Sequence, residues 1–360
     1  MALLFSEPSS RKRAPSIQVF TNGQPLTGVV AAAVHSNNYF AADCFDLTIA
    51  LDADPTAGTM FWSGEASIEV DVRFRTDAEA GFSSVIQGRV DQLRLDPIAR
   101  VVQLEGRDYS AALIDSTVCE IFTNRTASEI ATSLAQRHGL LPIVSPTSAV
   151  IGRYYQNEHD SVSLDSFSGR ASEWDLLAYL AQQESHNLFV TGTTLSFLPE
   201  TGAGGSYWVC TPDDLMELRL NRVLTLAGDI EVAVKTWSSR QHIADVQTAR
   251  LTRTSNGGAS GGPDGEARRY VLIRPNLTSD AALLLAQRKL AELCKHDRTI
   301  ELLMPGNLDW TPRSTILLQG TGSDFDQAYR IDRIDRRFSP TTGFVQRVRA
   351  STIPSPALFH

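Results

Sequence analysis

The sequence predicts a mainly β protein with an α+β insert: two strand-rich regions, each a barrel or a sandwich, flank a small middle domain, and we call these regions the first and the second barrel. Apolar and polar residues alternate in short runs over residues 17–116 and again over 206–360, with turn residues between the runs. Residues 117–205 instead carry helical spacing and two helix-start signals. Many short strands separated by turns are typical of barrels and sandwiches.

The clearest element of the first barrel, residues 17–116, is a predicted hairpin. Its alternation runs through Val85, Val90 and Leu93, breaks at Asp96-Pro97, and resumes from Val101. Alternating runs separated by a proline-containing turn indicate two antiparallel strands. The chain ahead of this barrel, residues 1–16, is polar and is expected to form an N-terminal arm.

The middle region, residues 117–205, is expected to be a small α+β domain. Thr126-Ala127-Ser128-Glu129 is a capping box, and Gly139 stands where a helix C-terminus favours glycine. A second helix is predicted to open at Ser172-Glu173-Trp174-Asp175 and to lead into two short strands.

The second barrel is expected over residues 206–360, with one helix at 278–295. The segment 255–266 is too rich in glycine to hold one shape alone. It lacks the Gly-Lys-Ser/Thr ending of a phosphate-binding loop, so it is interpreted as a flexible strand connection. We expect its glycines to become ordered only against a partner; they are Gly257, Gly258, Gly261 and Gly262.

Composition narrows the class of protein. The 360 residues suffice for two to three domains, and the net charge of −8 argues against a basic nucleic-acid-binding surface. Four scattered cysteines form no C-x-x-C pair and are expected to be free thiols. No apolar run approaches the ~20 residues of a membrane span. We therefore expect a protein that stays in the cytoplasm until it is assembled or released.

No catalytic, cofactor-binding or metal-binding residue is predicted. The histidines form no metal-ligand motif, and no G-x-S-x-G sequence is present. Glu158-His159-Asp160, after Tyr154-Tyr155, is the best local cluster of titratable and aromatic groups, and a binding surface there stays open as an alternative. A pair of carboxylates acting as in a glycosidase also stays open, because sequence does not give their separation.

Three aromatic residues present a choice between core and interface. Phe61-Trp62 stands beside Ser63-Gly64 in a turn, and Trp310 precedes Thr311-Pro312. Large apolar side chains in turns either fold back over their own barrel, which is the favoured interpretation, or mark a subunit contact.

The order of these segments resembles the late control protein D family, the baseplate hub proteins of contractile phage tails. The resemblance spans roughly residues 17–350. It rests on the G-R-V-D…E-G-R-D-Y-S hairpin, T-A-S-E-I-A at 126–131, S-E-W-D-L-L-A-Y-L-A at 172–181, and the strands S-T-I-L-L-Q-G and Y-R-I-D-R-I-D. The upper half of type VI secretion spikes is similar as well. The family has no catalytic residues to carry over.

The resemblance implies a homotrimer in which two tube-like antiparallel β-barrels per chain make a ring of six. Such a ring would join a hexameric tail tube to a trimeric tail spike, beside the baseplate wedge proteins, and would frame a channel through which DNA passes without specific binding. It implies a virion protein of the tail baseplate that is assembled in the cytoplasm of the bacterial host, without membrane insertion. A tail-associated peptidoglycan hydrolase and a cell-wall-binding module are the alternatives, the latter because the middle domain resembles a lysin-motif fold.

Overall fold

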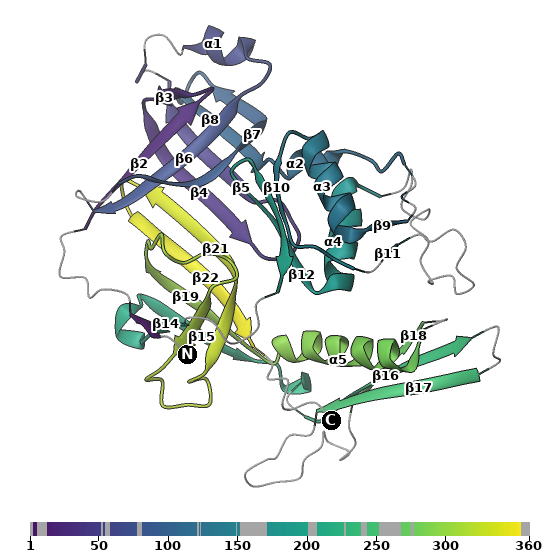
Figure 1. Ribbon diagram of the computed structural model, residues 1–360. Coiled ribbons are helices and arrows are strands. Elements are labelled where there is room, and N and C mark those ends of the chain that lie inside the picture. The colour runs from purple at the N-terminus through teal and green to yellow at the C-terminus, as the bar shows by residue number, and fades with distance from the viewer. Residues whose placement is uncertain are drawn as a thin grey trace.

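The computed structural model shows a mainly β chain with a small α-containing insert, as the sequence predicted (Figure 1). It describes residues 3–5, 13–51, 53–54, 58–77, 81–120, 122, 124–148, 150–151, 171–200, 207–226, 228–238, 243–251, 268–274 and 277–353. The glycine-rich segment 255–266, with Gly257, Gly258, Gly261 and Gly262, and the cluster at 154–160 lie outside these residues.

One 14-stranded sheet forms two curved lobes, each wrapped around its own apolar core. The first lobe contains β2 (Arg13–Thr21), β3 (Gln24–Leu26), β4 (Val29–Asn37), β5 (Cys44–Ala50), β6 (Glu69–Asp77), β7 (Ser83–Asp96) and β8 (Val101–Asp108). The second contains β14 (Tyr207–Cys210), β15 (Glu217–Arg222), β19 (Arg298–Pro305), β20 (Thr315–Leu318), β21 (Ala328–Ser339) and β22 (Gly343–Thr352). The predicted hairpin is β7 and β8, joined by the turn after Asp96.

The two lobes share one strand order. Across the sheet the first reads β2-β6-β7-β8-β5-β4, and the second reads β14-β20-β21-β22-β19-β15. In chain order, β2, β4, β5, β6, β7 and β8 therefore correspond to β14, β15, β19, β20, β21 and β22. The long strands β7 and β21 both carry a bulge, after Val90 and after Ile331. This topology indicates an internal duplication that the residues themselves do not display as a repeat.

Two ladders depart from the antiparallel pattern expected of the barrels. β14 runs parallel to β20, whereas its counterpart β2 runs antiparallel to β6. The short strand β1 (Leu3–Phe5) adds in parallel to β14. The chain enters β14 from the middle domain instead of from a hairpin, which leaves its direction unconstrained by a tight turn. Residues 1–16 thus include a strand of the second lobe and, from Arg13, the start of β2.

Trp62 and Trp310 occupy equivalent places in the two lobes. Trp62 lies in α1 (Thr59–Gly64), between β5 and β6, and Trp310 lies between the corresponding strands β19 and β20. Both indoles are buried in the core of their own lobe, with exposed fractions of 2% and 1%. Each therefore folds over its own barrel. Phe61 remains 41% exposed and packs edge-on against Trp62.

The middle domain follows β8 and has a core of its own. Its elements are α2 (Ala111–Asp115), β9 (Arg125–Thr126), α3 (Ala127–Arg137), β10 (Leu141–Val144), β11 (Val150–Ile151), α4 (Glu173–Glu184), β12 (His186–Thr191) and β13 (Thr194–Pro199). Both predicted helix starts are confirmed, because Thr126 and Ser172 each form a capping box. Gly139 adopts the left-handed conformation, with φ of +71°, just past α3.

A separate unit is inserted between β15 and β19, after the 3-10 turn η3 (Leu224–Leu226); another such turn, η2 (Pro212–Asp214), lies between β14 and β15. It consists of β16 (Ile230–Ser238), β17 (Ile243–Leu251), β18 (Arg268–Ile273) and α5 (Ser279–Lys295). We expected these strands and the helix within the second barrel, but they form a three-stranded sheet with its own core. The reason is the apolar stripe of α5, in which Ala282, Ala286, Leu290 and Cys294 recur every four residues and cover β16 and β17.

The two neighbours Phe61 and Trp62 give a direct test of this packing. We expect Trp62→Ala to lower the free energy of unfolding by about 3–5 kcal/mol, because it empties a core position. Phe61→Ala removes only an exposed ring and an edge-on aromatic contact, and we expect a loss of about 1 kcal/mol. Urea unfolding followed by circular dichroism measures both; equal losses would contradict the assignment of Trp62 to the core.

Candidate functional site: the joint between the lobes and its charged face

The two lobes are joined by backbone pairing between β4 and β21. The first half of β21 pairs with β20, and its second half, Arg333–Phe338, pairs with Ala32–Asn37 of β4. On its other side β21 pairs with β22 along its whole length. The edge strand of the first lobe therefore extends the sheet of the second, so both lobes share one wall (Figure 1).

Ionisable side chains cross this joint on the face opposite the cores. His35 of β4 lies directly opposite Asp335 of β21, with 2.6 Å between Nδ1 and Oδ1. The other ring nitrogen of His35 is 3.3 Å from Asp46 on β5. Arg333 Nε donates to the same Asp335 oxygen at 2.8 Å. Although burial opposes the shift, these hydrogen bonds from His35 and Arg333 lower the pKa of Asp335.

The same face carries ion pairs along most of the sheet. Side chains alternate across a strand, so the residues between the buried ones share one surface. The pairs on this surface are Glu217–Arg219, Glu217–Arg347, Glu301–Arg347, Glu301–Arg349, Asp335–Arg333, Glu105–Arg94, Asp91–Arg107, Glu69–Arg89 and Asp71–Arg73. We call this surface the ion-paired face.

The ion-paired face is strongly charged but locally neutral. Arg347 links Glu217 and Glu301, and its hydrogen bond lowers the pKa of Glu301. Single exposed pairs of this kind stabilise a fold by only about 0–1 kcal/mol. Their more evident effect is electrostatic, because each arginine in these pairs already faces a carboxylate.

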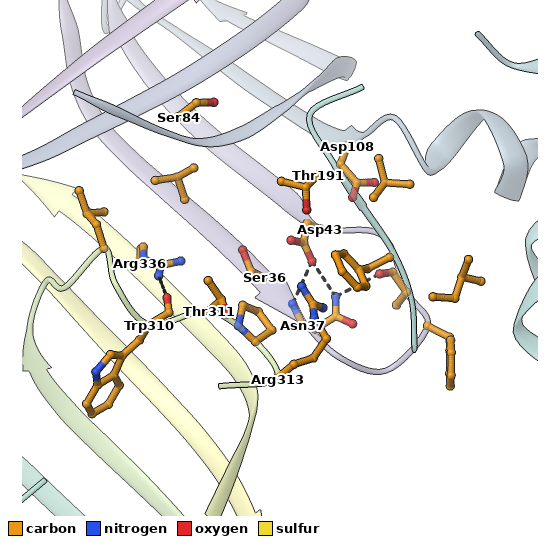
Figure 2. A pocket seen from close by; sticks show the side chains of 18 of the residues that line it. Ser36, Asn37, Asp43, Ser84, Asp108, Thr191, Trp310, Thr311, Arg313 and Arg336 are labelled. Atoms are coloured by element: carbon orange, nitrogen blue, oxygen red, sulfur yellow. Dashed lines mark hydrogen bonds between the residues drawn. The ribbon is translucent and has the colours of Figure 1, made fainter. Parts of the chain in front are cut away.

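A cavity of about 160 Å³ lies at the junction of the two lobes and the middle domain (Figure 2). Asn37 and Asp43 come from the first lobe, Phe189 from β12, and Arg313 and Arg336 from the second lobe. The main-chain N–H of Asn37 donates to Asp43 at 2.9 Å, and Arg336 donates to the carbonyl of Trp310. The Arg313 guanidinium lies 3.7 Å from the centre of the Phe189 ring, which ties the middle domain to the second lobe.

Burial shifts the pKa of the charged groups around this cavity. It raises the pKa of Asp43 to about 6 and that of Asp108 to about 7, and the neighbouring Asp43 charge adds to the rise at Asp108. It lowers the pKa of Arg313 and of Arg336 to about 10. The residues that line the cavity include serines and threonines but neither histidine nor cysteine.

The predicted site residues are only partly brought together. Trp310 lines the cavity, while Phe61 and Trp62 lie in the connection at the far end of the first lobe. Subunit contact by these residues stays a prediction, with Phe61 as the one exposed ring. Cys119 is an exposed thiol, and Cys210 and Cys294 are buried. Within the described ranges there is no group of three or more metal-ligating side chains and no helix fit to span a membrane.

Sequence reasoning missed the charged groups of the joint and cavity. One signal was present at Arg336, an arginine placed between Ile334 and Phe338 on the side of the strand that alternation assigns to the core. A charge at such a position requires a polar neighbour inside the fold. The partners themselves, Asp43 and the Trp310 carbonyl, belong to distant segments and gave no local signal.

Comparison with solved structures identifies the fold. The chain superposes on a tail protein from Neisseria meningitidis with a TM-score of 0.70 at 14% identity, covering 96% of this chain and 99% of that one. A 43 kDa tail protein of prophage MuSo2 from Shewanella oneidensis gives 0.68 at 16%, covering 96% and 100%. An E. coli component of the type VI secretion system, similar in structure to the T4 tail proteins gp27 and gp5, gives 0.55 at 10%, covering 94% and 79%.

The fold is therefore that of phage tail proteins and of related type VI secretion proteins, as the resemblance to the hub family implied. At these identities the likeness is one of fold. No protein-family model matches the sequence, and neither does any curated protein.

The raised pKa of Asp108 predicts a pH dependence of stability. The folded state binds this proton more tightly than the unfolded state, so the contribution is present at low pH and is lost as pH rises from about 4 to about 7. We expect Asp108→Asn, which cannot titrate, to gain roughly 1–2 kcal/mol relative to the wild type between pH 5 and pH 8. Urea unfolding at four pH values in this range measures the gain.

Asp326→Asn is the matched control for this experiment. Hydrogen bonds from Thr321 lower the pKa of Asp326, so its titration moves below the range tested. We expect it to keep the wild-type slope. Parallel curves for Asp108→Asn and the wild type would contradict the prediction.

Proposed function

We propose that this protein is a structural baseplate hub of a contractile phage tail, a trimeric adapter between the hexameric tail tube and the trimeric spike. The observation that supports this best is the shared strand order of the two lobes within one sheet. Three chains with two similar lobes each offer six near-equivalent faces to the tube and three true repeats to the spike. The likeness in fold to tail proteins over nearly the full chain supports the same role.

We infer a mechanical function, with no catalytic step. Two interactions cross domain boundaries at the junction: the charges of Arg313 and Arg336 in the second lobe favour the ionised form of Asp43 in the first lobe, and Arg313 also packs on the Phe189 ring of the middle domain. Such contacts fix the relative positions of the two lobes and the middle domain, which suits a part that transmits force between the tube, the spike and the baseplate wedge. In this proposal the protein belongs to the tail baseplate of the virion and is assembled in the host cytoplasm.

The ion-paired face is proposed to line the channel. A polyanion binds protein chiefly by releasing counterions when lysines and arginines neutralise its phosphates. On this face most arginines are already compensated by carboxylates, as Arg347 is by Glu217 and Glu301. DNA would therefore pass along the wall without being retained.

The trimer is tested by mass. We expect the purified chain to have about three times its 39.4 kDa mass at micromolar concentration and physiological salt. Mass photometry measures this directly. A stable monomer up to tens of micromolar would contradict the adapter role.

The channel wall is tested by removing its negative charges. We expect the triple variant Glu217→Gln, Glu301→Gln, Asp335→Asn to bind duplex DNA, because Arg219, Arg347 and Arg333 lose their partners. Its affinity should fall with salt at a log–log slope of about −0.9 for each phosphate neutralised, whereas the wild type should not bind at physiological salt. Fluorescence anisotropy with a labelled duplex measures both.

A second triple variant separates position from net charge. Glu65→Gln, Asp280→Asn and Glu292→Gln remove the same number of carboxylates from exposed positions away from the ion-paired face. Equal DNA binding by the two variants would show that overall charge, and not this face, controls retention.

A further inference from the structure

We propose that neighbouring copies of this chain are joined by β7 of one copy pairing with β15 of the next, in the register that β21 and β4 use within the chain. The inference rests on the proposed trimer and adds to it the strands and residues that make the contact. It follows from the duplication, in which β7 corresponds to β21 and β15 corresponds to β4.

The correspondence holds at the level of single hydrogen bonds. Just before the bulge of β7, the N–H of Val90 donates to the carbonyl of Ile68 at 3.0 Å. Just before the bulge of β21, the N–H of Ile331 donates to the carbonyl of Ser314 at 2.9 Å. Ile68 and Ser314 each immediately precede the strand that pairs with the first half, β6 and β20. The second halves of β7 and β21 therefore begin at equivalent points.

The two strands that would meet both have an open side among the described residues. β6 pairs with β7 only as far as Arg89, so Gln92–Asp96 pair with β8 alone. β15 pairs with β19 alone. In the second lobe the same side of β21 is filled by β4. An unpaired edge of five or six residues is a site where another strand adds readily.

Burial differs between the filled joint and the open edges. At the filled joint the inward side chains Val34 and Ile334 are fully buried. At the open edges the equivalent side chains are leucines that are only half buried: Leu93 and Leu95 on β7, and Leu218 and Leu220 on β15. Pairing of the two edges would cover these leucines from one side, as β4 and β21 cover one another, and would extend both cores across the boundary.

The in-chain joint also gives the register. Asp335 stands opposite His35 and Arg337 stands opposite Ala33. Arg94 and Asp96 of β7 correspond to Asp335 and Arg337 of β21. Asn221 and Arg219 of β15 correspond to His35 and Ala33 of β4. The proposed register therefore places Arg94 opposite Asn221 and Asp96 opposite Arg219, with Leu95 opposite Leu220 between them. Asp96 uses Oδ1 for the N–H groups of Ile98 and Ala99, which leaves Oδ2 for Arg219. The strand sequences Leu93-Arg94-Leu95 and Leu218-Arg219-Leu220 match in alternation.

This contact joins one lobe of a chain to the other lobe of its neighbour. Such a head-to-tail interface closes into a ring when the rotation allows it. A ring of three chains would then hold six equivalent strand joints, three within chains and three between them, and its wall would be the ion-paired face throughout.

Cysteine cross-linking tests the register in the full chain. With Cys119→Ser as background, we expect Arg94→Cys combined with Asn221→Cys to form disulfides between chains, giving covalent dimers and trimers on a non-reducing gel. Directly opposite residues of an antiparallel pair lie about 4.5–5.5 Å apart at Cα, within the range of a disulfide. Gln92→Cys with Asn221→Cys is displaced by two residues, and we expect at least a tenfold lower yield.

An in-chain pair is the positive control. Ala33→Cys with Arg337→Cys occupies directly opposite positions at the filled joint, two residues along from His35 and Asp335, and should close within one chain, without a covalent oligomer. Mass photometry of the reduced variants reports assembly separately. If the chain is a trimer and the control pair closes, but Arg94→Cys with Asn221→Cys forms no disulfide, the proposed pairing is overturned. The adapter role is left intact by that result. A monomer would overturn both.

Discussion

The architecture depends on the backbone ladder between β4 and β21. Without it the chain would be two small barrels on a tether, each with an unpaired edge; with it, the sheet runs unbroken from one lobe to the other. The middle domain and the β16–β18 unit are both inserted at connections, between β8 and β14 and between β15 and β19. Neither insertion interrupts the continuous sheet, so a duplicated barrel could acquire these units without losing the joint between its lobes.

The joint combines two kinds of polar contact that act differently. On the ion-paired face, exposed pairs such as Asp335–Arg333 neutralise charge but contribute little stability one by one. On the inner side, around the cavity, Asp43, Arg313 and Arg336 are largely withdrawn from water, where a charge without a partner is costly. The charges of Arg313 and Arg336 favour the ionised form of Asp43 in the other lobe, and Arg313 packs on Phe189 of the middle domain, so these contacts favour one relative placement of the three domains.

Local features of the chain were predicted well because their causes are local. The capping boxes at Thr126 and Ser172 and the turn after Asp96 depend on residues within a few positions of one another. The helix at 278–295 was also placed correctly along the chain, with Thr278 as its cap. Its assignment to the second barrel was wrong, because the sequence indicates the strands beneath this helix but does not indicate which strands they pair with.

The sequence by itself determined where strands and helices begin, which side of each strand is apolar, and that no familiar catalytic motif is present. The tertiary structure alone decided which strands share an edge, that Trp62 and Trp310 occupy equivalent core positions, and that His35 meets Asp335 across 300 residues. The physical reason is that alternation and capping act over a few residues, whereas strand order is set by which apolar faces can be covered together. The duplication is visible only as topology because many apolar sequences satisfy the same pattern of burial.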